Sequence, residues 1–178
     1  DAPEFVRWIC VQLLKGQEVD KTTAYDLGKF LFSNEPGDGA RGLVASFLRV
    51  RYETADEYEG LLQAIGDTLA PAFTTPVPAG LPIVQFAEPF DGVDHSYMIT
   101  PLLAQHIQSL GYRAIHMVGK SSGPKFEMNL WDIAQALGAK AVGGNQDLAN
   151  AALPVGWFFH QSDMSTALDR WVKLRHQT

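Results

Sequence analysis

The strongest constraint on the fold is a change of periodicity at residues 71–80, PAFTTPVPAG, which contain three prolines. Before this segment apolar residues recur at helical spacing, and after it short runs rich in β-branched and aromatic residues alternate with helical stretches. A proline-rich stretch without a period is typical of a stiff linker. We therefore predict a helical subdomain over residues 1–70, a linker over 71–80 and an α/β domain over 81–178.

Four short helices are predicted within residues 1–70. Asp20 is a suitable N-cap for the second helix, and Thr54 forms a capping box with Glu57 at the start of the fourth. The expected inward faces are Phe5, Trp8, Ile9 and Leu13; Ala24, Leu27 and Leu31; Leu43, Val44, Phe47 and Leu48; and Tyr58, Leu61, Leu62, Ile65 and Leu69.

The aromatic residues of this helical part exceed what four short helices can hide among themselves. They are Phe5, Trp8, Phe30 and Phe32. Exposed apolar surface of this kind indicates an interface, so we expect a homodimer that associates through these helices. The tryptophans Trp8, Trp131, Trp157 and Trp171 all fall on apolar faces and are expected in the core.

The second part of the chain predicts an incomplete parallel sheet with helices between its strands. Strands are expected at 82–87, 112–118 and 155–159, because strand–helix–strand order implies parallel pairing with right-handed crossovers. The helices are expected around 98–110, with Ile99, Leu103, Ile107 and Leu110 inward; from 130, with Leu130, Ile133, Ala134 and Leu137 inward; near 145–152; and at the end, with Met164, Leu168 and Trp171 inward.

Two loops follow successive strands of this sheet and are expected to lie side by side at its carboxyl edge, where ligands bind in such folds. The first covers residues 88–97 and the second covers 119–126, with Gly119, Lys120, Ser121 and Ser122 at its start. A Gly-Ser loop ahead of a helix offers backbone N–H groups and a helix N-terminus to a phosphate. The second loop is thus a candidate phosphate site.

Composition restricts the function further. The net charge of −6, with both signs interspersed, argues against nucleic-acid binding, since such binding favours a basic face. The single cysteine, Cys10, excludes an internal disulfide and fits a cytoplasmic location. No apolar run approaches the roughly 18 residues of a membrane span. The chain begins with Asp1 and its last helix lacks a stop signal, so we expect a fragment.

Three segments resemble glycosyltransferase family 3, which contains the nucleoside phosphorylases and the anthranilate phosphoribosyltransferases. LVASFLRVRYETADEYEGLLQAI is similar to the family's AFLMALRVKGETPEELAGLVRAI pattern, and LWDIAQALGAK resembles ADVLEALGVK. GWFFHQSDMSTALDRWVKLR is similar to FLFAP…HPAM…VAPVR. The likeness spans almost the whole chain. It implies a small helical domain followed by an α/β domain, here truncated at the C-terminus.

The family binds phosphoribosyl pyrophosphate, or a nucleoside and phosphate, in the cleft between its helical and α/β domains. The resemblance matches Asp91 and Gly92 to the end of the family's GTGGD pyrophosphate loop and Thr100 to the threonine of its N-x-S-T run. It places Gly119, Ser121 and Ser122 at the KHGN…SS wall, where the charge of Lys120 suits a phosphate. Arg175 matches an acceptor-binding arginine, and Mg²⁺ is the implied cofactor, with acidic ligands that follow this segment in the family.

The first loop departs from the family pattern. EPFDG stands where consecutive glycines approach pyrophosphate, and Pro89 offers no N–H. We therefore expect a pentosyl or phosphoribosyl transferase of the anthranilate phosphoribosyltransferase-like type with an eroded pyrophosphate loop. This segment alone is expected to be inactive and to bind phosphoribosyl pyrophosphate weakly. The alternative is a non-catalytic homologue that binds nucleic acid or a regulatory metabolite.

Each candidate residue also has an ordinary structural interpretation. Asp91 and Gly92 can form a simple turn, Thr100 can cap a helix, and Lys120 to Ser122 can be a solvated loop. Arg175 can be an ordinary surface residue of the last helix. His95 is a candidate acid–base group without a partner at fixed spacing, and His116 lies inside a strand. A metal site of Asp94, His95 and His116 has no supporting ligand spacing.

Overall fold

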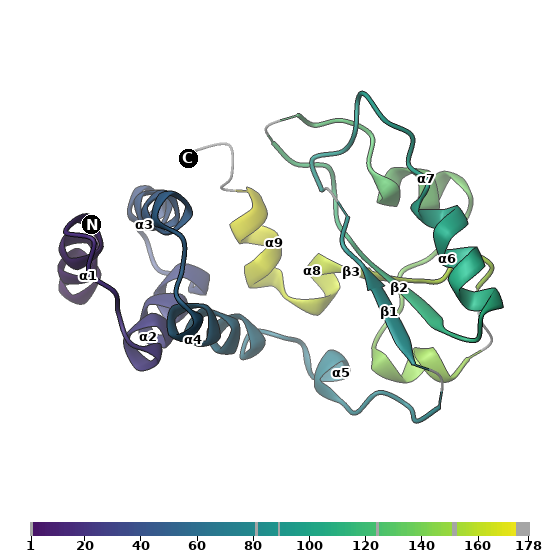
Figure 1. Cartoon of the computed structure of the whole chain (residues 1–178), viewed down its shortest axis with the longest axis horizontal. Coiled ribbons are helices and arrows are strands. Elements are labelled where there is room, and N and C mark those ends of the chain that lie inside the picture. Colours follow the sequence, from purple (N-terminus) through teal and green to yellow (C-terminus); the bar gives the residue numbers. More distant parts are fainter. Residues whose placement is uncertain (1, 81, 89, 124, 151–152, 174–178) are drawn as a thin grey trace. The chain divides into compact units, whose positions relative to one another are not determined.

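The computed structural model describes residues 2–80, 82–88, 90–123, 125–150 and 153–173 (Figure 1). The chain divides into two compact units, one from the described parts of residues 1–68 and 170–178 and the other from 69–169. The first is helical, and the second is built on a three-stranded parallel sheet. The predicted fold class, a small helical part followed by a parallel α/β part, is confirmed.

The helical unit contains α1 (Glu4–Leu14), α2 (Lys21–Phe32), α3 (Asp38–Arg51) and α4 (Ala55–Gly66). Both predicted caps are present. The Asp20 carboxylate accepts a hydrogen bond of 2.7 Å from the Thr23 N–H, and Thr54 and Glu57 form the capping box of α4. The core of the unit consists of Val6, Ile9, Leu13, Val19, Ala24, Leu27, Phe30, Leu31, Val44 and Leu48.

Helices α2 and α4 approach each other closely because glycines line their contact. A Cβ atom at Gly60 would lie 2.4 Å from the Lys21 carbonyl oxygen, and one at Gly28 would lie 2.5 Å from the Ala64 Cβ. The buried residues of α4 are accordingly Glu57, Gly60 and Ala64. Small residues therefore allow the closest approach of the two helices.

This packing corrects several predicted inward faces. Tyr58 and Leu62 are exposed because α4 turns its small residues toward α2 and leaves these larger side chains outside the contact. Trp8 is 56% exposed and Phe5 is 42% exposed, because α1 buries Val6, Ile9 and Leu13 instead. Trp8 is thus not a core residue.

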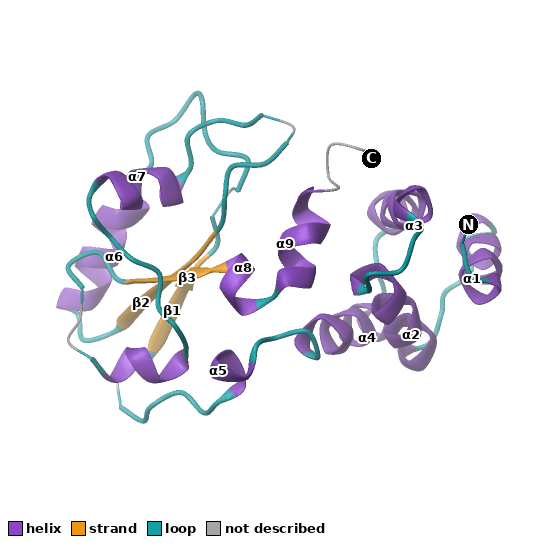
Figure 2. Cartoon of the chain, turned by 180° about the vertical axis from the view of Figure 1, so that it is seen from behind, coloured by secondary structure: helices purple, strands orange, loops and turns teal. Residues whose placement is uncertain are grey.

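The second unit contains strands β1 (Ile83–Phe86), β2 (Arg113–Val118) and β3 (Trp157–His160), in the order β1-β2-β3. Figure 2 shows the three strands side by side. Both pairings are parallel, as predicted, with Ile83 opposite Arg113 and Ile115 opposite Trp157. The connecting elements are α5 (Pro71–Thr74), α6 (Thr100–Ser109), α7 (Leu130–Ala136), the 3₁₀-helix η1 (Asn145–Ala149) and α8 (Gln161–Met164).

Successive side chains of β2 and β3 point to opposite faces of the sheet, and both faces are apolar. On one face Val118 and Phe158 pack with Leu130 and Ala134 of α7. On the other face the core is formed by Phe73, Val142, Leu148, Trp157 and Phe159. A sheet covered on both faces is expected for parallel strands.

The segment predicted as a linker is partly structured. Residues 71–74 form α5, whose start Pro71 suits, and the Phe73 ring packs edge-on against Phe159 at 5.9 Å. The Asn145 amide donates to the carbonyl oxygens of Phe73 and Thr75 at 2.9 and 2.7 Å. Residues 71–75 therefore pack against the sheet unit, with Phe73 in its core.

Helix α9 (Thr166–Lys173) spans the boundary between the two units. Its residues from Arg170 onward belong to the helical unit, so the sheet unit ends at Asp169, whereas the predicted α/β part ends at residue 178. The Arg170 guanidinium donates to the carbonyl oxygens of Phe32 and Ser33 at 3.0 Å each. The Trp171 ring packs edge-on against Phe32 at 5.9 Å. These contacts satisfy carbonyl groups at the end of α2, which lack partners within the helix.

The connecting helices of the sheet unit also correct the predicted faces. Helix α6 buries Ala104, whereas Ile99, Leu103 and Leu110 are exposed, because the small side chain lets α6 lie close to the sheet. In α7, Leu130 and Ala134 are buried and Leu137 is exposed. The expected last helix is two helices, since Ser165 has an extended backbone between α8 and α9.

Among the described residues, every helix is too short or too polar to cross a membrane.

Candidate functional site

The loops after β1 and β2 lie side by side at the carboxyl edge of the sheet, as the strand order predicts. Loop 1 (residues 87–99) and loop 2 (residues 119–129) are joined by backbone hydrogen bonds. The Glu127 N–H donates to the Asp91 carbonyl at 3.0 Å, and the Ser122 N–H donates to the Phe90 carbonyl at 3.3 Å. The sheet thereby brings Asp91, Gly92, Gly119, Lys120, Ser121 and Ser122 into one pair of loops.

Gly92 makes this pairing possible. Its φ of +86° lies in the left-handed region that favours glycine. A Cβ atom there would lie 2.5 Å from the Glu127 carbonyl oxygen and 2.7 Å from that of Met128. A side chain at position 92 would therefore push the two loops apart.

Asn129 fixes both loops from the start of α7. Its side-chain amide donates to the Gly119 carbonyl at 2.9 Å and to the Phe90 carbonyl at 3.1 Å. Its side-chain oxygen accepts the Asp132 N–H at 3.1 Å, and the Asp132 carboxylate accepts the Asn129 N–H, which completes a capping box. Sequence analysis missed this residue, although Asn followed three positions later by Asp is a recognisable helix start.

Because α7 is capped by its own side chains, the uncapped helix N-terminus at this sheet edge is that of α6. Helix α7 begins several residues after the Gly-Ser run, at Leu130, and Asn129 already occupies its first turn. Helix α6 follows loop 1 and has no side-chain cap at its N-terminus, where Thr100 and Pro101 stand. The available helix dipole at this edge therefore belongs to α6, not to the helix that the Gly-Ser loop precedes.

The candidate phosphate residues of loop 2 differ in availability. Lys120 is exposed at the carboxyl end of β2. The Ser121 hydroxyl donates to the Glu127 carbonyl at 2.7 Å, and the Ser122 hydroxyl is buried with no hydrogen-bond partner among the described residues. Gly119 is buried against the Gln161 side-chain amide, with no room for a Cβ atom. Lys120 is thus the most exposed of these four residues.

Thr100 and His116 meet at a third residue, Glu88 of loop 1. The Thr100 hydroxyl lies 3.4 Å from Glu88 Oε2, and His116 Nδ1 lies 3.2 Å from Glu88 Oε1. His116 Nε2 lies 2.8 Å from the Val155 carbonyl oxygen. The imidazole is stacked between Phe86 and Phe158, with ring centroids 5.2 and 5.0 Å away. His116 is therefore a buried sheet residue, and it ties loop 1 to β2.

The other charged residues of the loops form a separate, exposed group. The Asp94 carboxylate lies 3.4 Å from His95 Nε2 and 4.0 Å from Lys125 Nζ. His116 is buried with Glu88 instead, so Asp94, His95 and His116 are not brought together as metal ligands. No group of three His, Cys, Asp or Glu residues suited to a metal ion occurs in the described part of the chain. Arg175 lies outside the described residues.

Comparison with known proteins decides the fold. The structure matches the crystal structure of anthranilate phosphoribosyltransferase (TrpD) from Thermus thermophilus with a TM-score of 0.71, at 15% sequence identity, over 98% of this chain and 50% of that one. The chain has an anthranilate phosphoribosyltransferase fold. It spans about half the length of that solved structure. No protein-family model matches the sequence, and no curated protein sequence does either.

In this phosphoribosyltransferase-like fold a third polar segment lies at the same sheet edge and begins with His160, the last residue of β3. Burial lowers the pKa of His160 below its ordinary value, and nearby Lys120 lowers this pKa further, against the opposing effect of Asp163 and Asp169. His160 Nδ1 lies 2.7 Å from the Ser162 hydroxyl, and its ring packs against Trp131. Sequence analysis missed this segment, although residues after a third parallel strand belong to the same edge.

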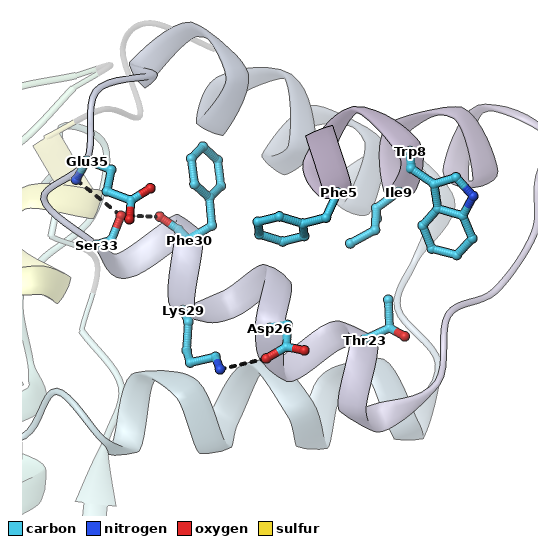
Figure 3. A pocket seen from close by; sticks show the side chains of 9 residues that line it. All are labelled: Phe5, Trp8, Ile9, Thr23, Asp26, Lys29, Phe30, Ser33 and Glu35. Carbon is cyan, nitrogen blue, oxygen red and sulfur yellow. Dashed lines mark hydrogen bonds and ion pairs between the residues drawn. The ribbon is translucent and has the colours of Figure 1, made fainter. Parts of the chain in front are cut away.

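Other grooves of the described residues lie away from these loops, and two of them have many apolar lining residues, one in each unit. The groove of the helical unit, about 480 Å³, has Phe5, Trp8, Ile9 and Phe30 on its walls and the ion pair of Asp26 and Lys29 at its rim (Figure 3). The groove of the sheet unit, about 470 Å³, lies beside α7 and is almost entirely apolar. Neither contains the residues of the two loops.

Proposed function

We propose that loop 1, loop 2 and the N-terminus of α6 bind a ribose phosphate, as part of a pentosyl or phosphoribosyl transferase of the glycosyltransferase family 3 type. The pairing of the two loops at the carboxyl edge of the sheet carries this proposal. It places an exposed lysine, Lys120, and an uncapped helix N-terminus at neighbouring loops. Both attract anions, and catalysis of this class consists largely of electrostatic positioning.

The same geometry predicts weak binding of phosphoribosyl pyrophosphate. In loop 1 the Phe90 carbonyl is already bound by Ser122 and Asn129, and Pro89 has no N–H to donate. The loop also carries Glu88, Asp91 and Asp94. Each hydrogen bond forgone costs about 1 kcal/mol of binding free energy. We therefore expect no transfer to anthranilate by this chain.

In this proposal Mg²⁺ binds together with the phosphate of the ligand and is not held by the protein alone. Mg²⁺ is commonly held by one or two carboxylates together with substrate phosphates. The described residues provide no ligand cluster of their own, and Asp94 is engaged with Lys125. Asp91 is the carboxylate of loop 1 best placed in sequence for such a role, and we derive no step that depends on the ion.

A binding function without catalysis is the second candidate. The replacement of the glycine-rich pattern by EPFDG in loop 1 favours it, because close approach of backbone to pyrophosphate is what such glycines provide. In this case the same edge binds a regulatory metabolite that carries a phosphate. The net charge of −6 argues against nucleic acid as this ligand.

Isothermal calorimetry with phosphoribosyl pyrophosphate and with ribose 5-phosphate, each with Mg²⁺, tests the site. Lys120→Ala should weaken binding about tenfold, since it removes a charged contact to phosphate. Lys140→Ala is the matched control, because Lys140 is an exposed lysine of the same unit outside both loops. Equal affinity of Lys120→Ala and the unaltered chain would contradict the proposed site. Turnover of anthranilate at an ordinary enzymatic rate would contradict the expected loss of activity.

We also propose that the chain forms a homodimer through its N-terminal helices. Phe5, Trp8, Val11 and Leu14 are all exposed and recur every three residues along α1. Phe5 and Trp8 also line the groove of the helical unit (Figure 3). An apolar stripe that continues into a groove is typical of an interface between subunits.

A further inference from the structure

The groove of the sheet unit is an apolar site that the proposed function does not use. Its volume of about 470 Å³ lies within the range of small-molecule sites. Its principal apolar lining is formed by Leu130, Ile133 and Ala134 of α7, Leu137 at the end of that helix, residues 153–155 and Phe158 of β3. Leu137 is 73% exposed and Leu153 is 38% exposed, so the groove presents apolar surface to water.

Hydrogen bonds anchor the segment 153–155, which forms one wall of the groove. The Gln108 side-chain amide donates to the carbonyl oxygens of Leu153 and Pro154 at 2.8 and 3.1 Å. The Val155 carbonyl oxygen lies 2.8 Å from His116 Nε2. Closing the groove by moving this wall toward α7 would break these contacts, and buried polar groups are costly to leave unpaired. The groove is therefore held open by the fold.

Lys140 is the one charged residue among the described residues that line the groove. It has no ion pair or side-chain hydrogen bond with any described residue. The end of α7 does not need it, because the N–H groups of Gly138 and Ala139 already donate to the carbonyl oxygens of Gln135 and Ala134, at 2.9 Å each. Its charge is thus available to a ligand.

We infer that this groove binds a medium-chain carboxylate, with the aliphatic chain along α7 and the carboxylate at Lys140. The lining extends from Leu130 at the start of this seven-residue helix to Lys140 beyond its end. Seven helical residues span about 10 Å, which is the length of an unbranched chain of about eight carbon atoms. A single cation beside an apolar groove complements a ligand with one anionic end. The inference does not depend on the proposed ribose phosphate site.

Titration of the whole chain with octanoate, followed by proton–nitrogen correlation NMR, tests the site. Signals of residues 133–140 and 153–158 should shift. Hexanoate should bind about fivefold to tenfold more weakly, because it buries two fewer methylene groups. Octanol carries the chain without the charge and should bind about threefold to fivefold more weakly, the effect of an exposed ion pair. Acetate, which has the charge without the chain, should leave these signals in place.

Lys140→Gln tests the position of the carboxylate. It should abolish the preference for octanoate over octanol and leave octanol binding unchanged. Lys15→Gln is the matched control, because Lys15 is also an exposed lysine near a glycine of positive φ at a helix end, in the helical unit. Equal octanoate affinity of Lys140→Gln and the unaltered chain would overturn the inference.

Leu137→Glu tests the groove itself at a position whose exposure leaves the fold intact. It should weaken octanoate about tenfold or more, because the new carboxylate repels that of the ligand and competes for Lys140. Leu110→Glu is the control, since Leu110 is an exposed leucine at the end of α6 that does not line the groove. Equal losses in the two variants would overturn the site. Shifts confined to the groove of the helical unit, or none with millimolar octanoate, would overturn it as well.

Discussion

At the scale of single residues, Glu57 shows how one buried carboxylate organises a helix start and a long-range contact. Its carboxylate accepts the N–H groups of Thr54 and Val19 at 2.9 Å each, and Arg51 donates to it at 2.5 Å. Burial alone would raise the pKa of Glu57, but these hydrogen bonds outweigh burial and lower the pKa below its ordinary value. The ionised form is therefore the one that the folded chain stabilises.

This arrangement predicts a pH-dependent stability. Because the pKa of Glu57 is lower in the folded chain, its contribution is complete above the ordinary glutamate pKa and is lost as the pH falls through the folded value. Glu57→Ala should lower the free energy of unfolding by about 3 kcal/mol at pH 7, since it leaves donors and Arg51 without their partner. Urea unfolding between pH 3 and pH 7 measures both effects.

The control for this variant is Asp56→Asn, which removes an exposed acidic group from the same helical turn. Its effect at pH 7 should stay near 0.5 kcal/mol, the scale of an exposed charge at a helix end. If Glu57→Ala and Asp56→Asn were equally stable at pH 7, the proposed role of the buried carboxylate would be wrong.

At the scale of elements, Asn129 unites a helix start with two loops. The amide that binds Phe90 and Gly119 and the oxygen that caps α7 belong to one side chain. Loop 1 and loop 2 are therefore positioned by the same residue that determines where α7 begins. This explains why the Gly-Ser run does not lead directly into a helix.

Two substitutions separate these roles. Asn129→Asp keeps an oxygen for the Asp132 N–H, but a carboxylate cannot donate to the carbonyl groups of Phe90 and Gly119. Asn129→Ala removes both functions. We expect Asn129→Ala to cost about 2 to 3 kcal/mol of stability, from a lost cap and unpaired buried carbonyl groups.

Hydrogen exchange measures which of these roles is lost. In Asn129→Asp, amides of loops 1 and 2 should exchange faster while those of α7 keep their protection. In Asn129→Ala, both sets should exchange faster. Unchanged loop exchange in Asn129→Asp would show that the backbone hydrogen bonds between loop 1 and loop 2, such as the one from Glu127 to Asp91, suffice to hold the loops.

Structural features that depend on residues close together in the sequence could be predicted from it. The cap at Asp20 and the capping box of Thr54 depend on residues three positions apart, and both are present. The inward faces of α4 and α6 could not be predicted from periodicity. Gly60 and Ala104 lie at the contacts because small side chains permit close approach, and this depends on the neighbouring element. The two loops were predicted as neighbours, whereas the Glu88–His116 contact joins residues 28 positions apart.

At the scale of the whole molecule, the chain builds two units that each have a core. Arg170 and Trp171 of α9 contact Phe32 in the helical unit. Phe73 of α5 lies in the core of the sheet unit. Each unit thus contains residues that the sequence-based boundaries assigned to another segment. The boundary residues could not be predicted because their assignment depends on tertiary contacts of single side chains.

The proposed homodimer gives the prediction that belongs to this scale. Trp8 is the largest exposed side chain of the α1 stripe and also lines the groove of the helical unit. Trp8→Glu should weaken a dimer at least tenfold, because a buried tryptophan at an interface contributes about 2 kcal/mol or more and a charge there would be desolvated. Sedimentation equilibrium from 1 to about 100 μM measures the dissociation constant.

Leu110→Glu is the matched control for the dimer. Leu110 is an exposed leucine at the end of α6 in the sheet unit, so a charge there should leave self-association unchanged. Far-UV circular dichroism of both variants should match the unaltered chain, because neither residue is in a core. A monomer at tens of micromolar for the unaltered chain would contradict the dimer itself. A dimer that Leu110→Glu weakens and Trp8→Glu does not would place the interface on the sheet unit instead of α1.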